Sequence, residues 1–403
     1  MKVSLVGPHA EVDDAGRIGD ETNPARRVSG LAATLASHGH AVTVYTRRTR
    51  AGQPDEGTTS AGYAVKVLTA GESAVARPDD ELPFMGEFAQ RLDAAWASNR
   101  PDVVHADWWT YGIAAQLAAN HHGVPTVHSF TAVGSVQRRR QNRDAVSENR
   151  MRMEKVLARN ASWVTASCSE DVDDLVRFGR PRGRMSILGR GVDTDAFAVD
   201  GPIASRAERD RVIVVARNLL PHKNIDLLIR AMATVPDAEL LVIGGPPRSE
   251  LRRHAEACRL HRLAVDGAVA DRVHFTGFVP AADMPALMRS ADVLVCPSAY
   301  EPFGVPVVEA MACGVPVVAS SAGGMVDTVV HDVTGLLVSS VSPVTLGQAI
   351  RNVLRQGVLR RGMGLAGRAR ATSRYAWDRV ARDTAVVYDR LVAPDGRQVR
   401  QPS

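Results

Sequence analysis

The sequence lacks the features that mark several classes of protein. It has no uncharged apolar run of about 18 residues, so a membrane-spanning helix is not expected. The opening MKVSLVGPH lacks the charged, apolar and small-residue zones of a signal peptide. No C-x-x-C pair or metal spacing occurs among the four cysteines, which are Cys168, Cys258, Cys296 and Cys313. These absences favour a cytoplasmic protein with reduced thiols.

Aromatic residues and lysines are also scarce. Aromatic side chains make up 5% of the chain, and no basic stripe alternates with stacking rings, so nucleic-acid binding is not expected. Lysine occurs only at positions 2, 66, 155 and 223, although lysine and arginine together number 49. A lysine inside a chemical motif is therefore informative in this chain, whereas a net charge of +5 indicates little about partners.

What is present indicates a two-domain α/β protein. The 403 residues are 45% apolar and 23% charged, which is typical of globular domains. Short apolar strands alternate with helical segments over residues 4–167 and again over 211–356, a pattern of parallel sheets covered on both faces. The polar stretch 193–210 contains a Gly-Pro pair and no period, so it marks a boundary. We predict doubly wound domains over 1–200 and 201–375, with a helix in 376–403 packing back on the first domain.

The segment SAYEPFGVPVVEAMACGVPVVASSAGG (298–324) carries the clearest chemistry. A loop leaves a buried strand and enters a helix, whose free N–H groups and dipole attract anions. Gly304 lets the backbone approach a ligand closely. Glu301 precedes the helix and Glu309 lies inside it, so the two carboxylates can reach different parts of one extended ligand.

Further candidates follow other strands of the second domain. Gly323 and Gly324 predict a second glycine-rich helix start beside the first. Arg217 follows the first strand of this domain, and Lys223 lies in the loop after it. Because the carboxyl ends of strands in a doubly wound sheet converge on the ligand crevice, we expect these groups to meet there. Two cations opposite helix N-termini suit a diphosphate leaving group.

Taken together, these motifs resemble family 4 retaining glycosyltransferases (glycosyl transferases group 1), in particular the actinobacterial inositol-phosphate and aminocyclitol types. The resemblance extends over most of the chain, including GHAVTVYTRR, PDVVHA, GVPTV and RYAWDRVA. It implies the GT-B architecture, two Rossmann-like domains facing across a deep cleft. It also implies that Glu309 holds the ribose, that Glu301 orients the donor sugar, and that Arg217 and Lys223 neutralise the diphosphate. The other implied donor contacts are Phe278, Phe303, Gly304, Val305, Gly323 and Gly324.

The resemblance implies a retaining hexosyl transfer from a nucleotide-diphosphate sugar, of the UDP or GDP type, to a hydroxyl of a small polar acceptor. The leaving phosphate can take the proton of the acceptor, so a dedicated base is not needed. With two fixed cations, a divalent metal is not required, and no cofactor is expected. The assembly is left open, with a homodimer as one option.

The first domain departs from the family pattern on the acceptor side. Asn23 stands where relatives carry part of a Gly-Gly pair, and Thr131 replaces a histidine that contacts the donor sugar in relatives. Asp79 replaces the phosphate-reading lysine of relatives that glycosylate inositol phosphate. Arg150 fits the family pattern.

These departures guide the prediction of the acceptor. The residues Asp79, Asp80, Glu81 and Asp107 would make the rim acidic, which favours a neutral or cationic acceptor. We expect an aminocyclitol from antibiotic or other secondary metabolism; a phosphoinositol, a sugar phosphate or a lipid is the alternative. Trp108 either lines this site or packs in the core. A catalytically impaired partner protein of the same fold is a weaker alternative, which the missing histidine leaves open.

The basic run 137–155 has two interpretations. It either binds an acidic or membrane-surface ligand or forms a solvated helix face laced with acidic residues. A dinucleotide-dependent dehydrogenase is disfavoured because no Gly-x-Gly-x-x-Gly turn follows a strand. A pyridoxal-phosphate phosphorylase is disfavoured because no lysine follows Lys223.

Overall fold

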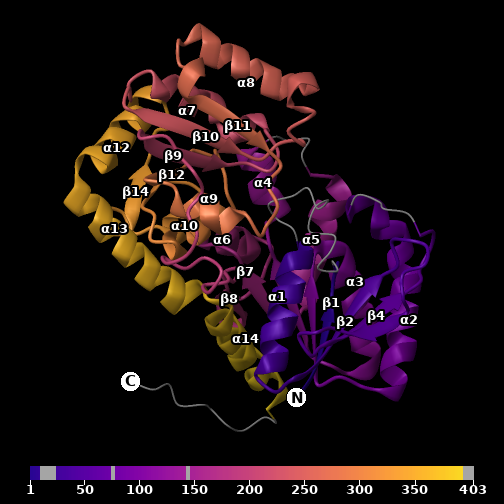
Figure 1. Ribbon diagram of the computed structural model, residues 1–403. Coiled ribbons are helices and arrows are strands. Elements are labelled where there is room, and N and C mark those ends of the chain that lie inside the picture. Colours follow the sequence, from indigo (N-terminus) through magenta and orange to yellow (C-terminus); the bar gives the residue numbers. More distant parts are fainter. Residues whose placement is uncertain (10–23, 74–77, 142–145, 394–403) are drawn as a thin grey trace.

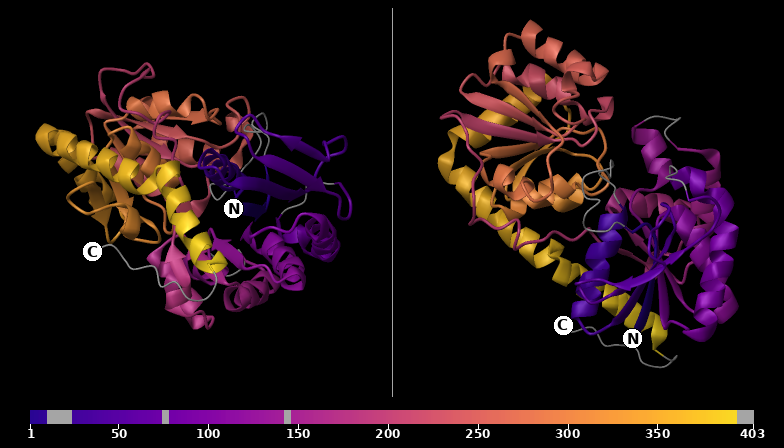
Figure 2. Two further views of the ribbon diagram at one scale, coloured as in Figure 1. Left: turned by 90° about the horizontal axis from the view of Figure 1, so that it is seen from below. Right: turned by 45° about the vertical axis from the view of Figure 1, so that its right-hand side comes forward.

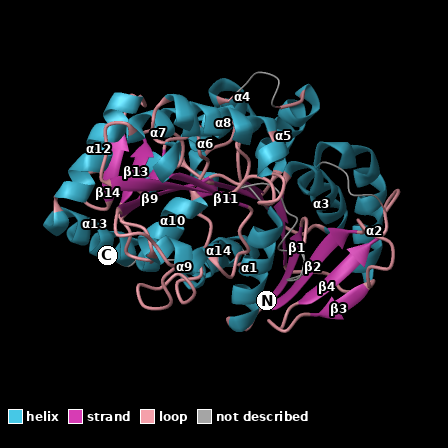
Figure 3. Ribbon diagram, turned by 45° about the horizontal axis from the view of Figure 1, so that its top comes forward, coloured by secondary structure: helices cyan, strands magenta, loops and turns pink. Residues whose placement is uncertain are grey.

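The computed structural model describes residues 1–9, 24–73, 78–141 and 146–393, and the statements below concern these residues. Two α/β domains, each built on its own sheet, lie side by side (Figure 1). Helices flank both sheets (Figure 3). The predicted fold class, two doubly wound Rossmann-like domains, is therefore confirmed.

The first domain contains an eight-stranded sheet in the order β3-β4-β2-β1-β5-β6-β7-β8. Neighbouring strands are parallel except for β3, which pairs antiparallel with β4 at the edge. The strands are β1 (Lys2–Val6), β2 (Ala41–Arg47), β3 (Glu56–Thr58), β4 (Ala64–Leu68), β5 (Val103–Asp107), β6 (Thr126–Phe130), β7 (Trp163–Ala166) and β8 (Met185–Ile187). Both β5 and β6 are buried along their whole length, as the apolar runs predict.

Helices cover both faces of this sheet. Side chains of α2 and α3 pack on one face, and those of α1 pack on the other. The helices are α1 (Pro24–Ser37), α2 (Met85–Ser98), α3 (Trp109–His122), α4 (Gly134–Arg140), α5 (Glu148–Asn160) and α6 (Ser169–Arg177), and a 3-10 segment, η2 (Pro78–Phe84), precedes α2. Alternate residues of β1 enter the two cores, with Val6 on one side and Leu5 on the other.

The second domain contains a fully parallel six-stranded sheet in the order β11-β10-β9-β12-β13-β14. Its strands are β9 (Asp210–Val215), β10 (Ala238–Ile243), β11 (Val273–Gly277), β12 (Val293–Cys296), β13 (Val317–Ser320) and β14 (Gly335–Val338). Its helices are α7 (Ile225–Met232), α8 (Ala255–Asp266), α9 (Met284–Arg289), α10 (Val305–Ala312), α11 (Met325–Thr328), α12 (Pro343–Arg355) and α13 (Gly357–Arg370). A short 3-10 segment, η5 (Pro221–Lys223), follows β9.

The chain crosses between the domains twice, and the two crossings lie side by side. The Val192 N–H donates to the Tyr375 carbonyl at 2.8 Å, and the Trp377 N–H donates back to Val192 at 3.3 Å. After the second crossing, α14 (Trp377–Val392) packs against α1 of the first domain, and Tyr388 joins the core there (Figure 2). None of the described helices has both the length and the apolar character needed to span a membrane.

Candidate functional site

A cavity of about 520 Å³ lies between the two domains. Arg26 and Arg27 of α1 line it from the first domain, whereas Arg217 after β9 and Glu309 of α10 line it from the second. Arg190 lines it from the first crossing segment. The cavity thus opens where the strands of the second domain end, as expected for a ligand crevice in a doubly wound sheet.

Part of the cavity lining is apolar. Phe278, which is 42% exposed, lines the cavity together with Met284. Gly244 and Gly245, with φ of 117° and 90°, also line it, and the Gly244 N–H donates to the carbonyl of Gly277, the residue before Phe278. A Cβ on Gly244 would lie 2.2 Å from the carbonyl oxygen of Ala216, so a side chain there would be excluded. An exposed ring beside bare backbone is suited to a planar ligand group.

Another part of the lining is rich in charge. Burial raises the pKa of Glu309 to about 7, although Arg217, Arg26 and Arg190 act in the opposite direction. Burial and the neighbouring Arg217 lower the pKa of Arg26. Arg217 and Glu309 were predicted from the sequence, whereas Arg26 and Arg190 were missed. The sequence carries no local signal for them, because they belong to an arginine-rich chain and meet only in three dimensions.

Lys223 and Glu301 form a buried ion pair. The Lys223 ammonium donates to Glu301 Oε2 at 2.9 Å, and each residue is 6% exposed. The family resemblance predicts that these residues contact different parts of the donor, the lysine the diphosphate and the glutamate the sugar. The structure brings them together instead, so in this arrangement the lysine charge is already balanced.

Hydrogen bonds from neighbouring segments hold the backbone of the loop that carries Glu301, residues 297–304. The Gly324 N–H donates to the Glu301 carbonyl at 2.8 Å. Three further bonds hold the start of the loop: Ala299 N–H to His222 O at 2.8 Å, Asn224 Nδ2 to Pro297 O at 2.9 Å, and Ser320 Oγ to Ser298 O at 2.6 Å. The anchors come from the segments after β9 and β13, the strands that flank β12.

The predicted glycines lie against this same loop. Gly304, with φ of 78°, begins α10, and a Cβ there would lie 2.1 Å from Met325 Cε. Gly323 and Gly324 approach it from the other side, where a Cβ would lie 2.4 Å from the Glu301 carbonyl and 2.3 Å from the Pro302 carbonyl, respectively. The glycine pair therefore provides close packing. Of the other predicted donor contacts, Phe303 is buried with its ring edge-on to Tyr375, and Val305 lines the cavity.

A contact between the domains adjoins the same loop. The Tyr300 hydroxyl donates to Asp171 Oδ1 of α6 at 3.1 Å, and both side chains are fully buried. Burial raises the pKa of Asp171 to about 7, while hydrogen bonds from Tyr300 and Cys168 oppose this. Ser169 and Asp327 also meet across the domains through the backbone N–H and hydroxyl of the serine. The position of Glu301 is thus linked to the first domain.

The structure contradicts two of the four acids expected in the acidic rim on the acceptor side. Asp107 is buried and paired with Arg27. Glu81 is paired with the fully buried Arg47 at 3.3 Å. Two of the four acids therefore have their charge balanced inside the protein. The prediction was wrong for these two acids. The sequence does not reveal their partners, because the arginines lie on α1 and β2, far from the acids along the chain.

Other predicted acceptor residues cluster at the ends of β5 and β6. Trp108 is half-buried with φ of 74°, a backbone conformation that costs a non-glycine residue about 1–3 kcal/mol and recurs at functional sites. The Arg150 guanidinium lies 5.0 Å from its ring centre and donates to Glu154 at 2.7 Å. Thr131 is buried. Asn23 lies outside the described residues, and the side chain of Asp79 is not among those described.

The basic run on α4 and α5 is mostly paired with acids, which favours its interpretation as a solvated, ion-paired face. Its pairs are Arg138 with Glu148 at 2.5 Å, Arg139 with Asp174 at 3.1 Å, and Arg140 with Glu170 at 2.8 Å.

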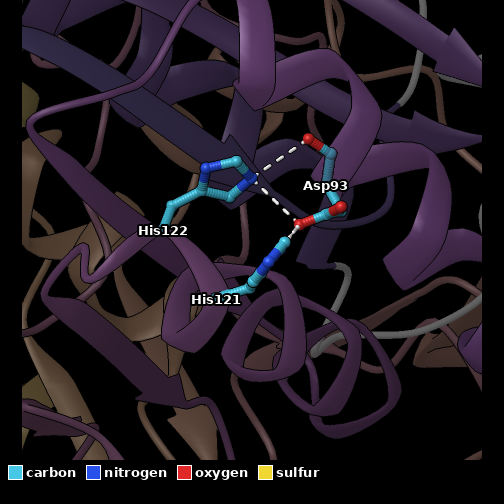
Figure 4. Close-up of side chains that lie close together, drawn as sticks. All are labelled: Asp93, His121 and His122. Carbon is cyan, nitrogen blue, oxygen red and sulfur yellow. Dashed lines mark hydrogen bonds and ion pairs between the residues drawn. The ribbon is translucent and has the colours of Figure 1, made fainter.

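Within the described part of the chain, one group of side chains places metal-binding atoms close together, namely Asp93, His121 and His122 (Figure 4). His121 Nδ1 lies 2.5 Å and His122 Nε2 3.0 Å from Asp93 Oδ1. His122 Nε2 also lies 3.1 Å from the backbone carbonyl of Asp93, which can only accept, so this nitrogen carries a proton. Hydrogen bonds joining α2 to α3 account for the group, and none of its members lines the cavity.

Comparisons with known proteins agree with this architecture. Residues 23–191 match the glycosyl transferase 4-like domain, and residues 202–370 match glycosyl transferases group 1. A D-inositol 3-phosphate glycosyltransferase of Jonesia denitrificans is 31% identical over 89% of this chain and 89% of its own. Sucrose-phosphate synthase from Thermosynechococcus elongatus has a TM-score of 0.83 at 26% identity, over 97% of this chain and 99% of its own.

A further solved structure, Anabaena HepE in complex with UDP-glucose, has a TM-score of 0.72 at 21% identity and covers 97% of this chain and 100% of its own. Its likeness adds to the agreement in fold, which spans both domains. The chain therefore belongs to the glycosyl transferases group 1 family and is a GT-B glycosyltransferase.

Proposed function

We propose that the protein transfers a sugar from a nucleotide-diphosphate sugar, with retention of configuration, and that the nucleotide occupies the interdomain cavity. The observation that carries this proposal is the lining of that one cavity. It combines an exposed aromatic ring, Phe278, and bare glycine backbone with the Glu309 carboxylate and three arginines. A nucleotide has matching parts, namely a planar base, a ribose with hydroxyl groups and an anionic diphosphate. HepE, a neighbour in fold, was solved with UDP and with UDP-glucose.

The proposed roles follow from these positions. The base lies against Phe278, the ribose hydroxyls donate to the Glu309 carboxylate, and the diphosphate lies beside Arg217 and the N-terminal end of α10. Glu301, held by Lys223, faces the sugar. When the bond from the anomeric carbon to the diphosphate breaks, its electron pair passes to the phosphate oxygen. The acceptor hydroxyl then attacks from the same face and gives its proton to that oxygen, so the proposal requires no metal.

For the acceptor we propose an inositol phosphate in place of the aminocyclitol favoured by the sequence alone. The relatives that are 30–31% identical carry the name D-inositol 3-phosphate glycosyltransferase. In addition, Asp107 and Glu81 are balanced by Arg27 and Arg47, which removes much of the negative charge that favoured a cation. The replacement of a family lysine by Asp79 is the feature on which this protein differs from those relatives.

An acceptor panel with one donor tests the proposal. We expect inositol phosphate to give roughly tenfold higher kcat/KM than inositol or an aminocyclitol, because a cation close to the acceptor phosphate would contribute about 1–4 kcal/mol. Proton NMR of the product should show the anomeric configuration of the donor. Faster transfer to the aminocyclitol would overturn the acceptor assignment, and an inverted product would overturn retention.

The pH dependence of nucleotide binding tests the role of Glu309. Its pKa of about 7 means that the free carboxyl group gains a proton below neutrality. A proton must then leave before the carboxylate accepts hydroxyl hydrogen bonds, so affinity should fall by up to roughly tenfold per pH unit below 7. Isothermal titration calorimetry measures this slope.

Two variants make this test specific. Glu309→Gln should flatten the slope, and Glu309→Ala should weaken binding by about 1.5–3 kcal/mol, the value of a charge-assisted hydrogen bond. The exposed Glu208→Gln is the matched control and should leave both the slope and the affinity unchanged. An unchanged affinity in folded Glu309→Ala would contradict the ribose assignment.

A further inference from the structure

Arginine side chains outnumber carboxylates in the lining of the cavity. The guanidinium groups of Arg26, Arg190 and Arg217 line it together with the carboxylates of Glu309 and Asp193. With both carboxylates ionised, these five described groups carry a net formal charge of +1. Lys223 and Glu301 add nothing to this sum, because they neutralise each other. Without Arg26 and Arg190, which the sequence does not single out, the two carboxylates would outnumber the one remaining arginine of this group.

This excess matches the chemistry of a diphosphate. The diphosphate of a sugar nucleotide carries about two negative charges, and about three once the sugar has left. Burial lowers the pKa of Arg26, and repulsion by Arg217 adds to this effect. Like charges in a partly buried site are costly unless an anion compensates them. Several donors that surround an anion of increasing charge are also the arrangement that stabilises a leaving group.

Neighbouring residues show that the position of Arg26 is specific. Arg27, the next residue of α1, is buried and paired with Asp107 of the same domain. Arg26 instead lines the cavity together with Arg217 and Glu309, which belong to the opposite domain. Arg190 is only 7% exposed and lies on the segment that crosses between the domains, two residues before Val192, which is bonded to the returning chain. Arginines from three separate parts of the chain thus meet in one cavity.

We propose that Arg26 and Arg190 bind the donor diphosphate and, with Arg217, supply the charge that stabilises it as it leaves. This inference rests on the proposed function and deepens it. Lys223 is then a positioning residue for Glu301. Because Arg26 and Arg217 come from different domains, the diphosphate bridges the domains, whereas a nucleoside without phosphates does not. The affinity gained from the phosphates therefore depends on Arg26 and Arg190.

A binding experiment measures how much affinity the phosphates add to that of the nucleoside. Isothermal titration calorimetry of the full chain with uridine, UMP and UDP, and with guanosine, GMP and GDP, gives the affinity ratio of diphosphate to nucleoside for the base that binds. Arg26→Gln and Arg190→Gln should each lower the diphosphate affinity by roughly ten- to a hundredfold and leave the nucleoside affinity within about twofold. Arg26→Lys, which keeps the charge, should recover part of the ratio. The exposed Arg91→Gln on α2 is the matched control.

The possible results distinguish the proposed role of Arg26 and Arg190 from the proposed nucleotide site itself. A ratio that stays at the wild-type value in folded Arg26→Gln and Arg190→Gln would overturn the role of these arginines but leave the nucleotide site intact. Equal losses for nucleoside and diphosphate would overturn it too, since that result indicates a purely structural role. If the wild-type protein binds no nucleotide of either series, the proposed function itself fails. If Arg190→Gln does not fold, the half-buried Arg26 still provides the test.

Discussion

Lys223→Ala is expected to lower turnover by on the order of a hundredfold or more. The lysine is the partner of Glu301 at 2.9 Å, and both side chains are almost fully buried. Removing it leaves a carboxylate without its balancing charge in a poorly solvated site, which favours protonation or displacement of that group. Glu301 would then no longer present a fixed carboxylate to the donor sugar.

The measurement is kcat at saturating donor and acceptor, with thermal unfolding as the check on folding. Lys66→Ala is the matched control, because Lys66 is partly exposed and forms only a long ion pair with Glu56 at 3.7 Å. The double variant Lys223→Met with Glu301→Gln should regain stability, since no buried charge is left unpaired, but should remain inactive. Near wild-type turnover in a folded Lys223→Ala protein would contradict the positioning role.

The second-domain motif was predictable because its parts are close in sequence. Glu301, Gly304 and Glu309 lie in one loop and the helix that follows, so strand and helix periodicity alone places them together. The pairing of Lys223 with Glu301 was not predictable in the same way. These residues are 78 positions apart, and they meet only because β9 and β12 are neighbours in the sheet.

Charges were the least predictable part of the site. The local charge near Asp107 and Glu81 depends on their ion-pair partners. Those partners are arginines on other elements, so the sequence alone does not show that the acids are neutralised. In a chain where nearly all basic residues are arginine, no single arginine stands out in the sequence. Arg26 and Arg190 come together only where the two domains pack against each other, and local sequence patterns do not predict that packing.

The region between β2 and β5 contained a signal that the sequence analysis missed. Phe88, Leu92 and Trp96 recur at helical spacing, and all three are buried in α2. The preceding strands are harder to detect, because β3 is exposed along its length and β4 is mostly half-buried. Edge strands of this kind lack the continuous apolar run that marked β5 and β6.

The second large effect is expected from Gly324→Ala. The glycine has φ of −67°, which alanine adopts without strain, so any effect must come from the added methyl group. That methyl group would lie 2.3 Å from the Pro302 carbonyl and 2.8 Å from Phe303 Cα, both of them backbone atoms of the loop that carries Glu301. The loop must therefore move, and the hydrogen bond from Gly324 N–H to Glu301 O must lengthen.

A displacement of about 1 Å at a reacting group can cost on the order of a hundredfold in rate, so we expect Gly324→Ala to lower kcat by that amount in a protein that still folds. Gly86→Ala is the matched control, because nothing lies within 4 Å of a Cβ at that position in α2. Steady-state kinetics and thermal unfolding of both variants give the comparison. Wild-type turnover in Gly324→Ala would show that the loop absorbs the methyl group without moving Glu301, and that the glycine pair does not set the position of this carboxylate.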